Sequence, residues 1–221
     1  MSHPDFDAVI FDLDGTLVDT EVLCNATGVE ACDALGHPVS EAFFETLAGI
    51  DDVRRVALIS EHVGAPIDQA SFFAEWDRLC SLRFASGIPL KPGVPEIFEI
   101  IASIGLPMAV CTSSRRGPAS EKIAAAGFGH WLQAVVTVDD VEQAKPAPAP
   151  YLLAAQRLGV VPSRCLAFED SETGASSAMA AGMRVVQVPD MHPTDGRNAH
   201  FIATSLLGGA ELAGLRWTTP N

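Results

Sequence analysis

Short apolar runs alternate with longer amphipathic stretches along most of this chain. Five runs are typical of strands buried on both faces of a parallel sheet: residues 8–11, 107–111, 134–138, 165–168 and 185–188. Four stretches have helical character, and each is followed by a glycine that suits a left-handed helix stop: residues 94–104, 118–126, 151–158 and 173–181. Strand and helix alternating at this spacing predict an α/β fold with a doubly wound parallel sheet.

Residues 19–87 interrupt this alternation. They contain no convincing buried strand, and apolar residues such as Val22, Ala26 and Val29 recur at helical spacing. The stretch 88–93 contains prolines and a glycine, which suits a linker that returns the chain to the sheet. We therefore expect a core domain made of residues 1–18 and 89–221, with residues 19–88 inserted as a helical domain.

The composition narrows the classes of protein that the chain can be. It has 221 residues, of which 48% are hydrophobic and 19% are charged, as expected for a folded globular protein. The formal net charge of −14 disfavours nucleic acid and an anionic membrane surface as partners. The opening MSHPDFD has no apolar stretch and no later run is long enough to span a membrane, so we expect a cytoplasmic protein. Five widely spaced cysteines without a CxxC pair indicate reduced thiols.

Polar clusters follow four of the predicted strands, at the point where each strand ends. Asp12 and Asp14 follow the first strand, residues 112–116 the second, and residues 169–170 the fourth, while Lys145 lies a loop beyond the third. In open α/β sheets, ligands bind beyond the carboxyl ends of the strands. We therefore expect these clusters to meet at one edge of the sheet.

The residue types in these clusters suit a magnesium and phosphate site. Mg²⁺ prefers oxygen ligands, which Asp12 and Asp170 can supply, and Glu169 either ligates the metal or orients Asp170 or a water molecule. A phosphoryl group needs hydroxyl and amide donors and a cation, which Thr112 and Lys145 can provide. Thr112 also suits the start of the helix that follows, and the two roles are compatible. The site would thus carry its own positive charge despite the acidic chain.

Four stretches carry a resemblance to a known family: "DLDGT" at residues 12–16, "VCTSS" at 110–114, "KPAP" at 145–148 and "FEDSETG" at 168–174. In order and spacing they are similar to the four motifs of the haloacid dehalogenase-like (HAD) hydrolases. The resemblance extends from residue 6 to about residue 188, and the insert stands where the β-phosphoglucomutase-like branch carries a helical cap. It implies a Rossmann-like core, with residues 19–88 as the α-helical cap domain.

The resemblance also implies roles for individual residues and Mg²⁺ as the cofactor. Asp12 would attack the substrate phosphorus and become an aspartyl-phosphate, and Asp14 would act as general acid and then as general base. It assigns phosphate binding to Thr112, Ser113 and Lys145, metal binding to Asp12, Asp14, Glu169 and Asp170, and substrate contacts to Ser114, Arg115, Gly49 and Arg54.

Departures from family patterns separate the reactions of the superfamily. A second aspartate at Asp14 favours phosphoryl transfer over dehalogenation. Cys24 stands where the related sugar phosphomutases carry a histidine, and residues 19–87 lack the lysine that phosphonate hydrolases need. The stretch "DTEVLCNA" at residues 19–26 resembles that of sugar-phosphate phosphatases of the 6-phosphogluconate phosphatase type.

We therefore predict a Mg²⁺-dependent phosphatase that hydrolyses a small phosphorylated metabolite, specifically a sugar phosphate. One alternative is a β-phosphoglucomutase-like sugar phosphomutase, which would isomerise its substrate without releasing phosphate. A second alternative is a non-catalytic module that binds the metal or a metabolite, which would bind magnesium without turnover. The sequence carries no signal for an oligomeric state.

Overall fold

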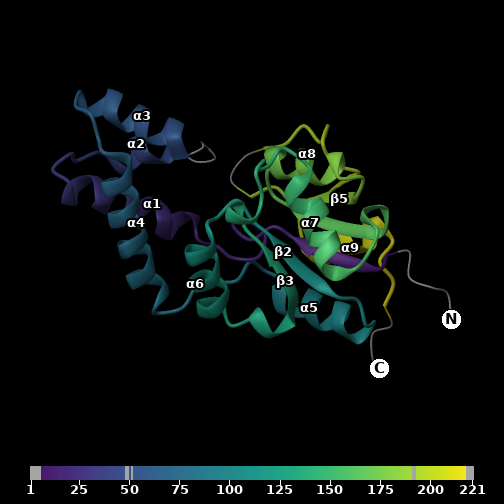
Figure 1. Cartoon of the computed structure of the whole chain (residues 1–221). Helices are drawn as coiled ribbons and strands as arrows, with labels where there is room; N and C mark the ends of the chain where they lie inside the picture. Colours follow the sequence, from purple (N-terminus) through teal and green to yellow (C-terminus); the bar gives the residue numbers. More distant parts are fainter. Residues whose placement is uncertain (1–5, 48–49, 51, 191–192, 218–221) are drawn as a thin grey trace. The chain divides into compact units, whose positions relative to one another are not determined.

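A unit built on a parallel sheet and a smaller helical unit make up the chain (Figure 1). The computed structural model describes residues 6–47, 50, 52–190 and 193–217. The sheet unit comprises Met1–Asp19 and Pro89–Asn221, and the helical unit comprises Thr20–Ile88. Among the described residues, no helix combines the length and apolar character needed to cross a membrane.

Six parallel strands form the sheet, in the order β3-β2-β1-β4-β5-β6. Their bounds are β1 Ala8–Phe11, β2 Met108–Cys111, β3 Leu132–Val136, β4 Cys165–Glu169, β5 Arg184–Gln187 and β6 Phe201–Ile202. The predicted α/β class and doubly wound sheet are confirmed. The sixth strand was not predicted, because its two residues are too few to form an apolar run.

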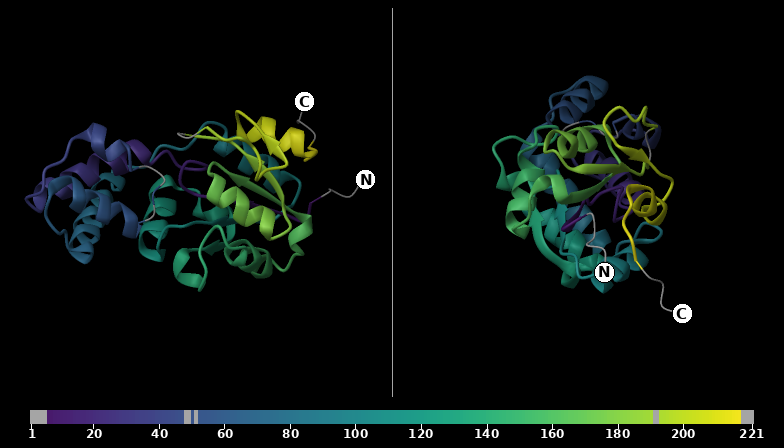
Figure 2. Two further views of the ribbon diagram at one scale, coloured as in Figure 1. Left: turned by 90° about the horizontal axis from the view of Figure 1, so that it is seen from above. Right: turned by 90° about the vertical axis from the view of Figure 1, so that its right-hand side faces the viewer.

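Helices cover both faces of this sheet (Figure 2). They are α5 Val94–Ser103, α6 Arg116–Ala126, α7 Ala149–Leu158, α8 Glu172–Ala180 and α9 Leu206–Ala213, with single turns of 3₁₀ helix at Gly129–Trp131, Val138–Asp140 and Pro162–Arg164. On one face α7 and α8 pack against an apolar cluster that contains Ile10 and Tyr151. On the other face Phe11 stacks on Phe168 and meets Phe98 of α5 edge-on. Burying such aromatic side chains contributes roughly 1.5–3 kcal/mol each to folding.

The order of the strands creates a switch point between β1 and β4. The chain proceeds from β1 outward through β2 and β3, and then from β4 outward through β5 and β6 on the other side. Phe11 pairs with Phe168, and the Asp12 amide donates to the Phe168 carbonyl at 2.9 Å. Residues that follow β1 and β4 are therefore held side by side, at the position where ligands bind in sheets of this order.

Two short segments of the sheet unit pair where the chain leaves it and returns. Val18 and Leu90 form an antiparallel bridge, and the Asp19 amide donates to the Pro89 carbonyl at 2.9 Å. The Lys91 ammonium lies 2.5 Å from Asp190 Oδ1. The two segments that connect the sheet unit to the helical unit are therefore hydrogen-bonded to each other.

The helical unit has its own apolar core. Its helices are α1 Glu21–Ala34, α2 Glu41–Glu45, α3 Asp52–Val63 and α4 Gln69–Phe84. Phe44, Ile59 and Phe72 are buried in its centre, and Trp76 packs against two of these rings. The guanidinium of Arg55 lies 4.9 Å from the Trp76 ring centre and donates to the Ile50 carbonyl. This contact ties the start of α3 to α4.

Candidate active site

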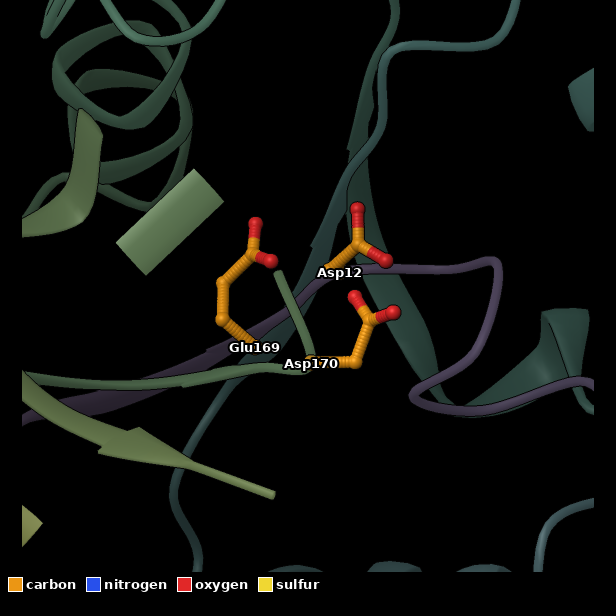
Figure 3. Close-up of side chains that lie close together, drawn as sticks. All are labelled: Asp12, Glu169 and Asp170. Atoms are coloured by element: carbon orange, nitrogen blue, oxygen red, sulfur yellow. The ribbon is translucent and has the colours of Figure 1, made fainter. Parts of the chain in front are cut away.

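Three carboxylates meet at the carboxyl ends of β1 and β4 (Figure 3). Asp12 follows β1, Glu169 is the last residue of β4, and Asp170 comes next. Each offers one oxygen, and these oxygens all lie within 4.8 Å of one another. The pairing of β1 with β4 brings the three together although 157 residues separate Asp12 from Glu169 in the sequence (169 − 12).

Lys145 places its ammonium against two of these carboxylates. Its Nζ donates to Asp12 Oδ1 at 2.7 Å, to Glu169 Oε1 at 2.6 Å and to the Cys111 carbonyl at 2.8 Å. Three bonds use all three N–H donors of the ammonium. Lys145 is thus fixed at the ends of β1, β2 and β4, the edge where the sequence predicted it.

Glu169 is fully buried and held by contacts to both of its oxygens. The Tyr151 hydroxyl donates to Oε1 at 2.8 Å, and the Ser171 hydroxyl donates to Oε2 at 3.1 Å. Gly174 makes room for this carboxylate, because a Cβ at that position would lie 1.8 Å from Oε1. A glycine in the first turn of α8 is therefore required by the packing of Glu169.

Gly15 makes room for Asp170 in the same way. Its φ of +83° is a left-handed conformation, and a Cβ there would lie 2.4 Å from Asp170 Oδ2. The Asp170 carbonyl accepts a hydrogen bond from Gln187 Nε2 at 3.2 Å. The glycine of the first motif thus lets the loop after β1 approach the end of β4.

The charges in this cluster do not balance within the protein. When all three carboxyl groups are ionised they face one ammonium, which leaves two negative charges (−3 + 1 = −2). Burial raises the pKa of both Asp12 and Asp170, and the neighbouring carboxylates raise it further. Burial by itself would lower the pKa of Lys145, but Asp12 and Glu169 hold it well above its usual value. An all-oxygen donor set with two excess negative charges fits a hard divalent cation.

Asp14 lies two residues after Asp12 in the chain, and a different set of donors holds its carboxylate. Lys122 Nζ lies 2.6 Å from Asp14 Oδ1, and the Ser114 hydroxyl donates to Oδ2 at 2.9 Å. The Asp14 side chain is 34% exposed, whereas that of Asp12 is 10% exposed. The two aspartates of the first motif therefore differ in both partner and environment.

The loop after β2 carries two of the three predicted phosphate-binding residues, Thr112 and Ser113. Thr112 is buried, and its Oγ1 accepts from the Ser114 amide at 3.0 Å. Ser113 is exposed, and Arg115 is an exposed residue at the N-cap of α6. Ser114, which was expected to contact the substrate, places its hydroxyl against Asp14.

The predicted substrate contacts of the insert belong to the helical unit. Arg54 is an exposed residue of α3. Gly49 lies outside the described residues. Their roles toward a substrate stay predictions.

Several residues at the site were missed from the sequence, and one of them carried a readable signal. Lys122 shares a buried face of α6 with Ala119 and Ile123, at helical spacing. A lysine in an apolar stripe indicates a buried ionic partner. Tyr151 and Ser171 offered no comparable signal, because a tyrosine in an apolar helix and a serine at an N-cap are ordinary.

Comparisons with known proteins identify the family to which the chain belongs. The family model described as haloacid dehalogenase-like hydrolase matches residues 6–182. The chain is 35% identical over 192 residues to protein CbbY of Rhodobacter capsulatus, covering 82% of this chain and 85% of that protein. It is 34% identical to the fructose-1-phosphate phosphatase YqaB of Escherichia coli, over 81% of this chain and 95% of that protein.

A solved structure shows the same likeness over nearly the whole chain. The crystal structure of a mutant CbbY from Rhodobacter sphaeroides in complex with xylulose-(1,5)bisphosphate is 28% identical, with a TM-score of 0.80. The match covers 96% of this chain and 100% of the CbbY chain. The chain belongs to the haloacid dehalogenase-like hydrolase family.

Proposed function

We propose that this protein is a Mg²⁺-dependent phosphatase that hydrolyses a small phosphorylated carbohydrate. The observation that carries the proposal is the position of Asp12 at the β1–β4 switch point, with Lys145 on its Oδ1 and Asp170 and Glu169 beside it. A carboxylate nucleophile, an ammonium and two further carboxylates are the groups that phosphoryl transfer through an enzyme-bound aspartyl-phosphate requires.

The first chemical step forms a bond between an Asp12 oxygen and the substrate phosphorus. The ester bond between phosphorus and the leaving oxygen breaks, and Asp14 in its protonated form gives that oxygen a proton. The products of this step are the free alcohol, an aspartyl-phosphate on Asp12 and the Asp14 carboxylate.

The second step returns the enzyme to its starting state. The Asp14 carboxylate takes a proton from a water molecule, whose oxygen attacks the phosphorus. The bond between phosphorus and Asp12 breaks, which releases inorganic phosphate and regenerates the Asp12 carboxylate. Asp14 is then protonated for the next turnover.

Asp12, Glu169 and Asp170 would hold the metal ion. Asp14 was also predicted as a ligand, but its carboxylate contacts Lys122 and Ser114, and in this proposal it serves as the general acid and base. When bound, Mg²⁺ supplies positive charge that shields the phosphoryl oxygens from the carboxylates. Lys145 holds Asp12 in the orientation for attack, and one of its three hydrogen bonds passes to a phosphoryl oxygen when the substrate binds. Thr112 and Ser113 donate to the remaining oxygens from the loop after β2.

The helical unit, Thr20–Ile88, acts in this proposal as a cap that excludes bulk water during the reaction. Arg54 and Gly49 on the cap, and Ser114 and Arg115 on the sheet unit, contact the substrate. The names of the relatives support a carbohydrate phosphate, since one is a fructose-1-phosphate phosphatase and another structure holds xylulose-(1,5)bisphosphate.

The test is phosphate release from a panel of sugar phosphates that includes fructose 1-phosphate. We expect turnover of a narrow group of substrates that stops on addition of EDTA and returns with MgCl₂. The Asp12→Asn variant should lose activity by about 10⁴-fold or more, because an amide is a poor nucleophile. Asp7→Asn is the matched control, since Asp7 pairs with Arg164 just before β1, at the opposite end of the strand.

Two results would contradict the proposal. Isomerised sugar phosphate without free phosphate would indicate the mutase reaction. Magnesium binding without turnover of any panel member would indicate a binding module.

A further inference from the structure

Lys122 joins Asp14 to the loop after β2. Its Nζ lies 2.6 Å from Asp14 Oδ1 and donates to the Ser114 hydroxyl at 3.0 Å. The Ser114 hydroxyl in turn donates to Asp14 Oδ2 at 2.9 Å. Both oxygens of the Asp14 carboxylate therefore have a donor, and the donors are bonded to each other.

Lysine is rare in this chain, and each lysine contacts an aspartate. The sequence contains three lysines, Lys91, Lys122 and Lys145, and each places its ammonium against an aspartate of the sheet unit. The Lys122 side chain is 10% exposed. Its ammonium therefore contributes little to the charge of the surface, and its position is explained by what it contacts.

Stability alone does not account for a lysine at this position. Ala119 and Ile123 are buried on the same face of α6, and an apolar side chain would suit this stripe. Replacing a largely buried ion pair with apolar side chains is often neutral or stabilising, because burying two charges is costly. An ion pair kept in such a place suggests a role in the orientation of the groups that it joins.

We infer that Lys122 is a positioning residue for Asp14, an inference that rests on the proposed function. Asp14 lies in a loop and its side chain is 34% exposed, so without a partner it would sample several rotamers. The Lys122 ammonium on Oδ1 and the Ser114 hydroxyl on Oδ2 together restrict the carboxylate to one orientation.

Ser114 extends this arrangement to the proposed phosphate-binding loop. Its amide donates to Thr112 Oγ1 at 3.0 Å, while its hydroxyl contacts Asp14. Lys122 therefore sets the position of the acid relative to the loop that binds the phosphoryl group. Proton transfer depends on this distance, since the proton must reach the leaving oxygen within hydrogen-bond range.

The test compares two substrates that differ in their need for a proton. The sugar oxygen of fructose 1-phosphate is a poor leaving group, so it needs a proton from a general acid. Nitrophenolate is a good leaving group, so cleavage of p-nitrophenyl phosphate does not need that proton. We measure the rate of aspartyl-phosphate formation by rapid quench, together with kcat and KM, in Lys122→Met, Lys122→Arg and Ser114→Ala. Arg164→Met, which removes a cation paired with Asp7 before β1, is the matched control.

For Lys122→Met we expect aspartyl-phosphate formation from fructose 1-phosphate to slow by about 10²-fold, the size of a general-acid contribution. With p-nitrophenyl phosphate the same step should slow by less than about 5-fold, because no proton is needed at the leaving oxygen. KM should change little, and Lys122→Arg should recover most of the rate. Equal losses with both substrates, or no loss with either, would overturn the inference.

A structural measurement separates this inference from the proposed function. Crystal structures of the wild type and of Lys122→Met should show the Asp14 carboxylate in one position in the first and displaced or in several positions in the second. An unchanged Asp14 in the variant would overturn the inference even if the enzyme is a phosphatase. Wild-type protein that turns over neither substrate nor any other sugar phosphate would overturn the proposed function, while the two structures still decide whether Lys122 positions Asp14.

Discussion

Two aspartates of one short motif each pair with a lysine, and the two pairs lie in different surroundings. The distance from Lys145 Nζ to Asp12 Oδ1 is 2.7 Å, and that from Lys122 Nζ to Asp14 Oδ1 is 2.6 Å. Lys145 and Asp12 are 3% and 10% exposed, whereas Lys122 and Asp14 are 10% and 34% exposed. Nearly identical contacts therefore operate in a dry environment and in a partly wet one.

The difference suits two different tasks. The pair of Asp12 and Lys145 adjoins two more carboxylates, so its charges are part of a buried network that a cation would complete. The pair of Asp14 and Lys122 has a neutral hydroxyl beside it and access to water. A nucleophile that must stay in place suits the first setting, and a group that must exchange protons suits the second.

The largest effect on turnover that would sharpen this comparison is expected for Asp14→Asn. Its kcat should fall by about 10²–10⁴-fold, since the variant can neither give nor take the proton. Its free energy of unfolding should change by less than about 1 kcal/mol, because a third of the side chain is exposed and water replaces part of the contact. Urea unfolding and steady-state kinetics measure the two quantities. A large loss of stability would show that Asp14 contributes to the free energy of unfolding as a buried ion-paired group does, which would contradict the comparison.

Lys145→Met tests the buried side of the comparison. Removing the ammonium leaves buried carboxylates unpaired and should lower the free energy of unfolding by about 3–5 kcal/mol. Added MgCl₂ should restore part of that loss, because a ligand that binds only the folded state stabilises it. Lys122→Met, measured in the same urea series, should lose only about 1 kcal/mol. Equal losses in the two variants would remove the distinction between the pairs.

Tyr151→Phe probes how far the buried network extends beyond the charges. The variant loses the hydroxyl that donates to Glu169 Oε1, so Mg²⁺ affinity should fall by about tenfold. Calorimetric titration with MgCl₂ measures this change. Ser177→Ala is the control, because it removes another buried hydroxyl, one that donates to the Ala147 carbonyl. An unchanged affinity in Tyr151→Phe would show that Lys145 and Ser171 suffice to orient Glu169.

The smallest effect is expected at the ion-pair cluster around Asp140, which lies in the 3₁₀ turn after β3. Burial by itself would raise the pKa of Asp140, but hydrogen bonds from Thr137, Arg157 and Arg116 hold it well below its usual value. A carboxyl whose pKa is lowered by folding stabilises the protein above its unfolded pKa, near 3.8, and loses that contribution as the pH falls further.

Asp140→Asn should therefore cost about 1–2 kcal/mol at pH 7 and leave kcat unchanged. The difference in urea midpoint between this variant and the wild type should shrink as the pH falls below about 4, because the unfolded wild-type chain then gains a proton at Asp140 that the folded protein does not bind. A difference that stays constant with pH would show that the negative charge of Asp140 does not contribute to the free energy of unfolding.

Much of the fold could be predicted because its signals are local. Buried parallel strands produce short apolar runs, and β1, β2, β4 and β5 lie within a few residues of the predicted ranges. The short strand β6 and the helix α9 escaped prediction, because two residues and a glycine-containing helix produce no clear periodicity. Gly209 weakens the helical pattern of α9, and its packing explains why a glycine stands there: a Cβ at this position would lie 2.5 Å from Val186 Cγ1.

The sequence by itself determined the α/β class and the position of a polar cluster after each of four strands. It also determined that Asp12, Lys145, Glu169 and Asp170 meet at one edge of the sheet. Residues at the carboxyl ends of neighbouring parallel strands must share one edge, so position along the chain was enough. Only the tertiary structure decided which side chains pair there. Lys122 and Asp14 are 108 residues apart, and their contact depends on the rotation of α6 and the burial of its face. The unequal burial of Asp12 and Asp14 likewise comes from packing between elements, which no local pattern encodes.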